Sequence, residues 1–381
     1  MDARTSVYCD YNATAPLRDS ARQAMLGAMA VDGNPSSIHA NGRSARRTIE
    51  DARKTILMGL GAEDYRLVFT SGATEALSMV LRPTTRRVRD TSDMAPPYGR
   101  NSRLFVATTE HVAALDGHGF ESPTKLAVDQ SGVVDLAALY EHLGAMAEDD
   151  ALVCVHGANN ETGVVQPIAD IARRCREAGA LFVSDLVQWI GREPIPDPLP
   201  DVMIISAHKL GGPAGVGALV YNPATVEFGP ALIRGGGQEM GARAGTENRV
   251  GIAGFAAAVT EALGEQEAEA NRVRGIRDSF ELALKEAFPS AIVFGDGAHR
   301  LPNTSCFALE GTQASTTLMR LDLEGIALSS GSACSSGKVK ASHVLAAMGA
   351  DDLLANCALR LSLGYGTTES DIRRVIEALR R

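Results

Sequence analysis

The segment Ser206-Ala207-His208-Lys209 places a lysine directly after an apolar run. Val202 to Ile205 reads as a buried strand, so Lys209 comes at its carboxyl end. Lysine is scarce in this chain, with six residues among the 37 that are Lys or Arg. Burial favours the neutral amine, which is the form that adds to an aldehyde and makes a Schiff base. Lys209 is therefore a candidate for covalent binding of an aldehyde.

A second run, Thr70-Ser71-Gly72-Ala73-Thr74-Glu75, follows another apolar stretch and opens a helical pattern. Backbone N–H groups at a helix start bind anions, and the Thr74 hydroxyl would face the same anion. The run lacks both the G-x-x-x-x-G-K-[ST] pattern of nucleoside triphosphatases and the G-x-G-x-x-G pattern of dinucleotide folds, which favours the phosphate of a small cofactor. A helix start without a ligand is the alternative. Together with Lys209, a phosphate site at this helix start predicts pyridoxal 5'-phosphate (PLP) as the cofactor.

PLP needs a carboxylate at its pyridine nitrogen, because the protonated ring is the better electron sink. Asp185 follows the predicted strand Leu181 to Ser184, and Gln188 one turn later could reach the ring hydroxyl. An ordinary helix cap is the alternative for Asp185. His111 ends its own strand in Thr109-Glu110-His111, from where an imidazole could lie over a flat ring and move protons near neutral pH. A structural histidine is the alternative there.

The run SSGSACSSG, residues 329–337, surrounds Cys334 with small, flexible residues. Structural cysteines usually lie among apolar neighbours, whereas a cysteine in an exposed loop can ionise and act as a nucleophile. Lys338 and Lys340 follow and would favour the thiolate modestly. An incidental loop cysteine is the alternative. The other five cysteines are scattered without a C-x-x-C pair, which disfavours a zinc ribbon and a disulfide framework.

Arg360 lies in the alternating sequence Leu359-Arg360-Leu361-Ser362-Leu363. A guanidinium within such a strand needs an anionic partner. A substrate carboxylate would serve, and a structural salt bridge is the alternative.

These residues are carried by a chain that alternates short β-branched runs with helical patterns between about residues 60 and 225. The alternation is typical of βαβ units and predicts a largely parallel sheet with helices on both faces. Ligands bind at the carboxyl ends of the strands in such sheets, which is where the candidate residues gather. The predicted strands are Arg66–Phe69, Leu104–Ala107, Leu152–His156, Leu181–Ser184, Val202–Ser206 and Gly217–Tyr221.

Helical spacing covers Ser44 to Leu60 and, after Gly235-Gly236-Gly237, a long stretch from about Val250 to Phe288. The long stretch predicts a bridge into a smaller α+β domain, built from the carboxyl-terminal residues and the first dozen of the chain. Arg82 to Arg103 contains Pro96-Pro97 and predicts an exposed excursion.

The composition limits the classes of partner that the protein is expected to bind. The net charge of -9 and the pI near 5.5 argue against nucleic acid or an anionic membrane, because both bind basic surfaces. No apolar run approaches the ~20 residues that cross a bilayer, and the amino terminus lacks the pattern of a secretory signal, so we expect a cytoplasmic protein. We expect no metal, because His39, His111 and His208 lack ligand spacing on one element.

Taken jointly, the motifs resemble one family along nearly the whole chain. They are similar to those of the group I cysteine desulfurases, the NifS/IscS branch of the class V aminotransferase-like PLP enzymes. The motifs are Asp10-Tyr11-Asn12-Ala13-Thr14, Asn34-Pro35-Ser36-Ser37-Ile38-His39, TSGATE, Thr109-Glu110-His111, Asn159-Asn160-Glu161-Thr162-Gly163, His208-Lys209, Arg243-Ala244-Gly245-Thr246-Glu247-Asn248 and SSGSACSSG.

The resemblance implies an α/β protein of PLP-dependent transferase fold type I. Its large domain, residues 15–258, would hold a mainly parallel seven-stranded sheet between helices. A smaller α+β domain, residues 1–14 and 259–381, would carry the Cys334 loop. The resemblance also implies a homodimer. Leu186 and Trp189 are larger than the residues usual at their positions in the family, which predicts a tighter or reshaped pocket wall.

The resemblance further implies site roles. Lys209 would bind PLP covalently, Asp185 would contact its ring nitrogen and Gln188 its ring hydroxyl. Other contacts to the cofactor would come from Ala73, Thr74, His111, Asn160, Ser206 and His208, with Thr246 reaching the phosphate of the neighbouring subunit. The substrate would be bound by Asn12, Asn34, Asn160 and Arg360, the last two at its carboxylate.

The implied reaction converts L-cysteine into L-alanine. Lys209 and His111 would move protons, and Cys334 would take the sulfur as a persulfide and pass it to an acceptor protein, for iron–sulfur cluster assembly or related sulfur trafficking. An aminotransferase has no use for the cysteine loop. A selenocysteine lyase, another class V PLP enzyme and a non-catalytic sulfur-relay protein are the alternatives.

Overall fold

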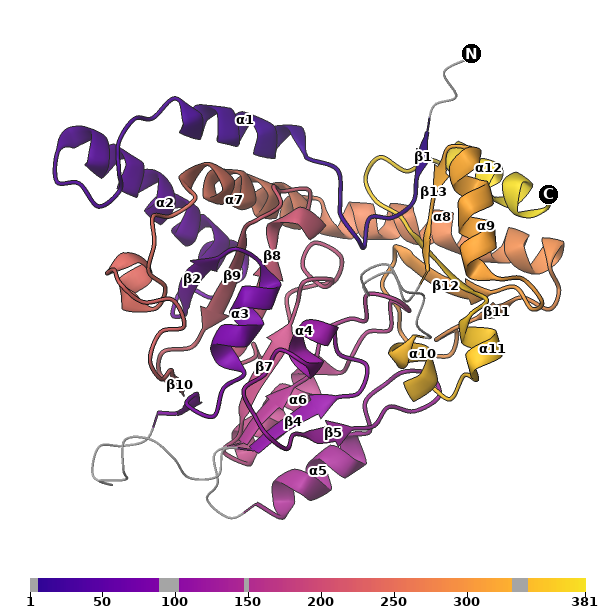
Figure 1. Ribbon diagram of the computed structural model, residues 1–381, viewed down its shortest axis with the longest axis horizontal. Coiled ribbons are helices and arrows are strands. Elements are labelled where there is room, and N and C mark those ends of the chain that lie inside the picture. Colours follow the sequence, from indigo (N-terminus) through magenta and orange to yellow (C-terminus); the bar gives the residue numbers. More distant parts are fainter. Residues whose placement is uncertain (1–5, 89–102, 147–150, 331–341) are drawn as a thin grey trace.

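The computed structural model describes residues 6–88, 103–146, 151–330 and 342–381. A large unit is built around a seven-stranded sheet, and a smaller unit made of the carboxyl-terminal third and the first described residues lies beside it (Figure 1). Cys334 lies outside the described residues, as do residues 89–102 of the predicted excursion. No helix in the described ranges is long and apolar enough to cross a membrane.

The central sheet has the strand order β2-β9-β8-β7-β6-β4-β5. Its neighbouring strands run parallel except where β9 pairs antiparallel with β2 and with β8, which confirms the mainly parallel seven-stranded sheet. The strands are β2 (Arg66–Thr70), β4 (Arg103–Ala107), β5 (Thr124–Leu126), β6 (Ala151–Cys154), β7 (Leu181–Asp185), β8 (Val202–Ser206) and β9 (Gly217–Tyr221).

Two details of this sheet differ from the sequence prediction by more than one residue at a strand end. The short edge strand β5 was not predicted, because three residues with one buried side chain show little periodicity. The predicted strand Leu152–His156 ends earlier, at Cys154. Its end has a physical cause, because the backbone N–H of His156 donates to the Glu110 carboxylate instead of to a strand carbonyl.

Helices cover both faces of the sheet, because successive strand residues point to opposite sides. In β2, Leu67 and Phe69 pack into the larger hydrophobic core and Val68 into the core on the other face. The larger core includes residues of α1 (Asp19–Met29), α2 (Ala40–Gly59), α5 (Leu136–Gly144), α6 (Ile168–Glu177) and α7 (Arg249–Gly264). The other face is covered by α3 (Ala73–Val80) and α4 (Val112–Leu115).

The helix α2 shows the predicted spacing, since Ala45, Ile49 and Ile56 are buried on one side. It begins four residues before the predicted start at Ser44, because the His39 side chain accepts from the Gly42 N–H and caps it.

The smaller unit contains an antiparallel sheet of order β11-β12-β15-β14 and the pair β1-β13, in which the amino-terminal strand runs parallel to a carboxyl-terminal one. The strand β3, in the described part of the predicted excursion, pairs antiparallel with β10 of the large unit. The strands are β1 (Val7–Tyr8), β3 (Arg86–Arg87), β10 (Val226–Glu227), β11 (Ile292–Val293), β12 (Thr304–Ala308), β13 (Ile326–Ala327), β14 (Ser329–Ser330) and β15 (Ala358–Ser362). The helices are α8 (Gln266–Ala287), α9 (Ala314–Leu323), α10 (His343–Ala347), α11 (Asp352–Ala355) and α12 (Glu369–Leu379).

The predicted helical stretch from Val250 to Phe288 is two helices, with Glu265 between α7 and α8. The predicted domain boundary after residue 258 falls inside α7. Val259 and Ala262 beyond it still pack into the core of the large unit, so the hydrophobic cores divide nearer Glu265.

Candidate active site

Two of the predicted motifs meet across a single glycine of the central sheet. Gly217 in β9 lies opposite Thr70 of β2 on one side and Ser206 of β8 on the other. The TSGATE run and the run that ends in Lys209 therefore leave the sheet side by side. A side chain at Gly217 would not fit, since a Cβ there would lie 2.8 Å from the Gly72 backbone. This close approach brings the predicted phosphate-binding residues to one end of the sheet.

The helix start in the TSGATE run has the features of an anion site. α3 begins at Ala73, and its N-cap Gly72 has no side chain to accept from the first N–H groups. The charge of Glu75, in the first turn of α3, is compensated. Its carboxylate accepts from the Ser71 N–H at 2.7 Å and pairs with Arg243 at 2.9 Å. The N–H groups of the first turn, including that of Thr74, are thus available to a phosphate.

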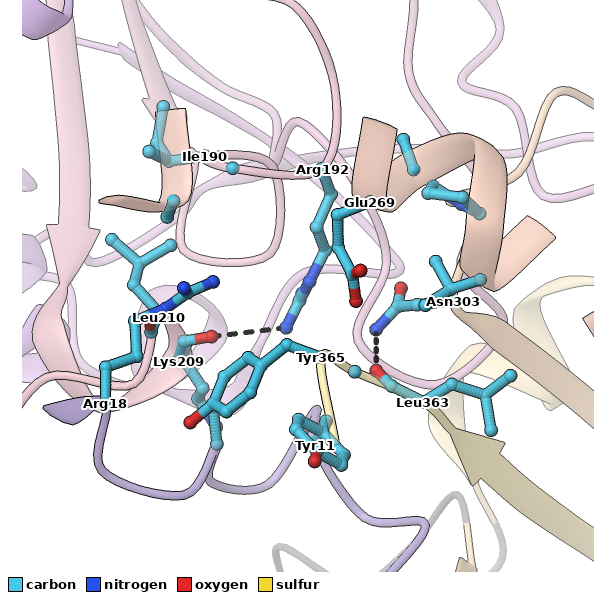
Figure 2. A pocket seen from close by; sticks show the side chains of 17 residues that line it. Tyr11, Arg18, Ile190, Arg192, Lys209, Leu210, Glu269, Asn303, Leu363 and Tyr365 are labelled. Atoms are coloured by element: carbon cyan, nitrogen blue, oxygen red, sulfur yellow. Dashed lines mark hydrogen bonds between the residues drawn. The ribbon is translucent and has the colours of Figure 1, made fainter. Parts of the chain in front are cut away.

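Lys209 ends a 3-10 turn, Ala207–Lys209, directly after β8, at the predicted strand exit. Its Nζ donates to the carbonyl oxygens of Asn12 and Ala13, at 2.7 Å each. Both carbonyls belong to the segment that enters the large unit from β1. Figure 2 shows Lys209 on the wall of a small cavity of about 50 Å³ that Tyr11 and Tyr365 also line.

His208, the neighbour of Lys209, contacts the same segment, because its Nδ1 lies 3.1 Å from the Thr14 hydroxyl. Burial, followed by the Lys209 charge, lowers the pKa of His208 to about 4. Its imidazole is therefore neutral at pH 7 and can serve as a hydrogen-bond donor without adding charge.

Asp185 is the last residue of β7 and is buried. One carboxylate oxygen accepts from the Val187 N–H at 2.9 Å, which is the contact of an Asx turn. No helix begins between β7 and β8, a stretch that the structure describes throughout, so Asp185 is not the helix cap considered as the alternative. Burial, and then the neighbouring Glu110 carboxyl, raise the pKa of Asp185 to about 6. A cation placed against Asp185 would stabilise its charged form, and the nitrogen of a protonated pyridine ring is such a cation.

His111 is the N-cap of α4, and its Nδ1 accepts from the Ala113 N–H at 3.1 Å. Burial, and then the charge of Lys209, lower its pKa. His111 is therefore neutral at pH 7, with its hydrogen on Nε2. The contribution of the Lys209 charge means that the two side chains lie within electrostatic range of each other, although they follow different strands.

Asn160 and Arg360 also come together. The Asn160 carbonyl oxygen accepts from Arg360 Nη1 at 3.0 Å and from the Asn12 amide at 3.1 Å. Arg360 is buried and its Nη2 donates to Asp10 at 2.7 Å, so the salt bridge considered as the alternative is present. Its buried Nε has no hydrogen-bond partner in the described chain, and an incoming carboxylate could still use it.

The Asn12 side chain is fully engaged by the protein. Its amide nitrogen donates to the Asn160 carbonyl and to Thr304, and its oxygen accepts from Asn303 at 3.1 Å. The Asn12 backbone carbonyl, in contrast, accepts from both Lys209 and Gln188. The contact of Asn12 with Lys209 and Gln188 thus runs through its backbone, which a sequence motif does not reveal.

Two predicted residues lie apart from this group. Asn34 is exposed in the loop before α2, where its side chain accepts from the Ser36 N–H. Thr246 is exposed and lines a second hollow of about 130 Å³ together with Thr70 and Ser71. The roles expected for Asn34 and Thr246 stay predictions.

Leu186 and Trp189 pack into the larger hydrophobic core. A Cβ at Gly157 would lie 2.7 Å from both of their side chains, and the Trp189 indole donates to the Pro194 carbonyl at 2.7 Å. The wall of the cavity beside Lys209 is instead formed by Ile190 and its neighbours. Leu186 and Trp189 thus fill the space beside Gly157, and the tighter or reshaped pocket wall stays a prediction.

Sequence reasoning missed two ionisable groups next to Asp185. Glu110 is fully buried, and its Oε1 lies 3.2 Å from Nδ1 of the buried His156. Both residues follow strands of the predicted sheet, Glu110 after β4 and His156 after β6. Reading every ionisable residue at a strand exit as part of the site would have found them.

Comparison with known proteins agrees with this geometry. The aminotransferase class-V family matches residues 7–375. A cysteine desulfurase from Cereibacter sphaeroides is 40% identical over 98% of this chain and 94% of its own. The chain belongs to the class-V aminotransferase family, in its cysteine desulfurase branch. The cysteine desulfurase NifS of Azotobacter vinelandii is also 40% identical, over 97% of this chain and 90% of its own.

Solved structures give the same fold. A NifS-like protein from Rickettsia africae superposes with a TM-score of 0.86, at 32% identity and 98% coverage of both chains. Fold type I of the PLP-dependent transferases, predicted from the motifs, is thereby confirmed.

The residues of the site fit PLP, the cofactor of this family. The uncapped start of α3 can take the phosphate, and Lys209 offers an amine at the neighbouring strand exit. The buried Asp185 carboxyl, with its raised pKa, fits a protonated ring nitrogen.

Proposed function

We propose that this protein is a PLP-dependent cysteine desulfurase that converts L-cysteine into L-alanine and passes the sulfur on through Cys334. The observation that carries the proposal is the position of Lys209 between the start of α3 and the buried Asp185, in a chain of the cysteine desulfurase branch. Bound PLP supplies an aldehyde that captures the substrate amine and a ring that accepts the electrons of the bond that breaks.

Residues of the chain itself would bind the cofactor and move the protons. Lys209 would hold the cofactor, and its amine in the free form would move a proton to and from the substrate. The Asn12 and Ala13 carbonyls, at 2.7 Å, fix the position of its Nζ. Asp185 keeps the ring nitrogen protonated, and the neutral His111 can donate from Nε2.

Cys334 lies outside the described residues, and its role rests on the sequence of its loop. Its thiolate attacks the substrate sulfur, a new S–S bond forms, and the C–S bond of the substrate breaks. The electron pair of the C–S bond stays with the carbon, which takes up a proton to become the methyl group of alanine. The sulfur remains on Cys334 as a persulfide.

The site also has a place for the substrate carboxylate. Arg360 and the Asn160 segment face each other at 3.0 Å, and the buried Arg360 Nε has a hydrogen to donate. We propose that the carboxylate of cysteine binds there.

We further propose that two copies of the chain form a homodimer. The side chains of Ile38 and Met240 are 90% and 61% exposed. Ser36, two residues before Ile38, lines one hollow together with Met240 and with Glu247, the neighbour of Thr246. A second copy that covered this face would bury the apolar side chains. The acceptor of the sulfur is proposed to be a second protein that meets the Cys334 loop. The five described cysteines form no disulfide, which is consistent with a reducing compartment such as the cytoplasm.

The test separates cofactor binding from sulfur transfer. Purified protein should be yellow, and borohydride should fix PLP to the peptide that contains Lys209. After brief exposure to cysteine without reductant, mass spectrometry should find one added sulfur on the peptide with Cys334. Cys334→Ser should stay yellow yet lose sulfur transfer, whereas Cys357→Ser, which changes the one cysteine among the described residues that is not buried, should keep it. Colourless protein, or added sulfur on another cysteine, would contradict the proposal.

A further inference from the structure

Arg192 is an unexplained charge beside the site. It comes four residues after Gln188 and lines the small cavity next to Lys209 (Figure 2). In the described part of the chain no carboxylate lies within ion-pair distance of its guanidinium, which contacts three oxygens that carry no net charge. Burial, and then the nearby Arg360 charge, lower the pKa of Arg192 to about 10. Keeping a cation here costs free energy, so its contacts need an explanation.

The contacts of Arg192 converge on two residues of the site. Nη1 donates to the side-chain oxygen of Gln188 and, at 3.0 Å, to the Gln188 backbone carbonyl. Nη2 donates to the Lys209 carbonyl at 3.4 Å. The Arg192 backbone is itself held from α8, because the Gln266 amide donates to its carbonyl at 3.1 Å. One guanidinium thus joins the residue expected at the ring hydroxyl of PLP to the lysine expected to bind PLP.

These contacts determine which way the Gln188 amide faces. Its oxygen accepts from Arg192, and its nitrogen donates to the Asn12 carbonyl at 3.0 Å. A flipped amide would place its NH2 against the guanidinium and its oxygen against the Asn12 carbonyl, so it would lose two hydrogen bonds and gain two repulsions. In the observed orientation one N–H is used by Asn12 and the second is left for another acceptor.

We propose that Arg192 is a positioning residue that fixes the Gln188 amide so that its second N–H donates to the ring oxygen of PLP. Arg192 does not touch the reacting atoms, and it acts through Gln188. The inference rests on the proposed function, since it requires PLP bound to Lys209. It extends that function by adding a residue outside the motifs that carry the family resemblance.

The proposal predicts the behaviour of the bound cofactor when pH is changed. A hydrogen bond to the ring oxygen withdraws negative charge from it, and the oxygen then holds the neighbouring titrating proton less strongly. Without Arg192 the Gln188 amide is held only by its hydrogen bond to the Asn12 carbonyl, so its second N–H is less firmly placed against the ring oxygen and this proton is held more strongly. The pH midpoint of the absorption change of Lys209-bound PLP should therefore rise, by about one pH unit, in Arg192→Met.

A double-mutant cycle tests whether Arg192 acts through Gln188. The absorption of the PLP-loaded enzyme is titrated with pH in wild type, Arg192→Met, Gln188→Ala and the double variant. If the proposal holds, at least half of the shift caused by Arg192→Met disappears when Gln188 is already Ala. The remainder reports the direct effect of the guanidinium charge on the cofactor. An equal shift in both backgrounds would overturn the proposal, as would Arg192→Met titrating like wild type.

Two further variants distinguish the proposed effect of Arg192 from a general loss of folding. Arg192→Lys keeps the charge and one donor, so it should restore part of the midpoint even if Arg192→Met folds poorly. Arg18→Met changes an arginine of the same cavity that pairs with Glu261 and Glu265, and its titration midpoint should stay at the wild-type value even if its stability falls. A wild-type protein that fails to bind PLP through Lys209 would contradict the proposed function. Wild type that binds PLP normally while Arg192→Met shows no shift would contradict only the role of Arg192.

Discussion

The contact between Gly217 and Gly72 gives a prediction whose size can be worked out from the structure. In Gly217→Ala the new Cβ would lie 2.8 Å from the Gly72 backbone and 2.9 Å from the Ile205 carbonyl oxygen. Both neighbours are backbone atoms, so neither can turn aside as a flexible side chain could. Overpacking of this kind costs about 1–3 kcal/mol.

The backbone shift would displace the residues that are expected to bind the phosphate of PLP. Gly72 precedes the first turn of α3, and Ile205 precedes Ser206. If the cost is borne when PLP binds, the dissociation constant rises roughly 5- to 150-fold, since about 1.4 kcal/mol corresponds to a tenfold change. The assay is titration of the apoenzyme with PLP, followed by quenching of Trp189, the single tryptophan of the chain.

Gly275→Ala is the matched control. Gly275 lies on the exposed side of α8, and a Cβ there would meet nothing within 4 Å. This variant should bind PLP like wild type and gain stability, by about 0.5–1 kcal/mol, because alanine favours the helix. If Gly217→Ala binds PLP within twofold of wild type and melts at the wild-type temperature, the reasoning about the close approach is refuted.

Two other predictions concern buried carboxyls. Burial raises the pKa of Glu161 to about 7 from a reference value of 4.5, so its contribution to stability is fully present below about pH 4.5 and is lost as pH rises through 7. Glu161→Gln stays neutral, and urea unfolding should show that the variant loses less stability than wild type between these pH values; parallel curves would contradict this. Asp185→Asn keeps the shape of the side chain but cannot pair as an anion with the ring nitrogen, so we expect PLP to bind while alanine formation at saturating cysteine slows at least tenfold. An unchanged rate would remove the proposed role of Asp185.

The sequence was sufficient to predict the strand exits of the large unit. An apolar run followed at once by polar residues marks the end of a buried strand, and parallel strands bring such ends to one edge. Lys209, Asp185 and His111 were predicted as site residues in this way, and each follows its predicted strand. Parallel pairing explains how residues about 100 positions apart in the chain come to the same edge of the sheet, and their roles in the site stay predictions.

Other parts of the site have no local signal. The Asn12 and Ala13 carbonyls that hold Lys209 are backbone atoms, which every residue has. Arg192 has no periodicity that marks it, because its contacts depend on how the turn after β7 folds back toward Lys209. The salt bridge between Arg360 and Asp10 joins residues 350 positions apart, and only the assembled smaller unit brings them together.

The pairing of Gly157 with Trp189 also has a consequence for protein engineering and for evolution. The indole occupies the space that a side chain at position 157 would need, so the two positions share one fixed volume. A larger residue at 157 alone would collide with the ring, and a small residue at 189 alone would leave a cavity and cost about 3–5 kcal/mol. A simultaneous exchange of bulk, small to large at 157 and large to small at 189, conserves the volume once the flexible end of Leu186, which a Cβ at 157 would also meet at 2.7 Å, has turned aside. We therefore expect the two positions to covary among relatives, and a chimaera that takes one of them without its partner to fold poorly.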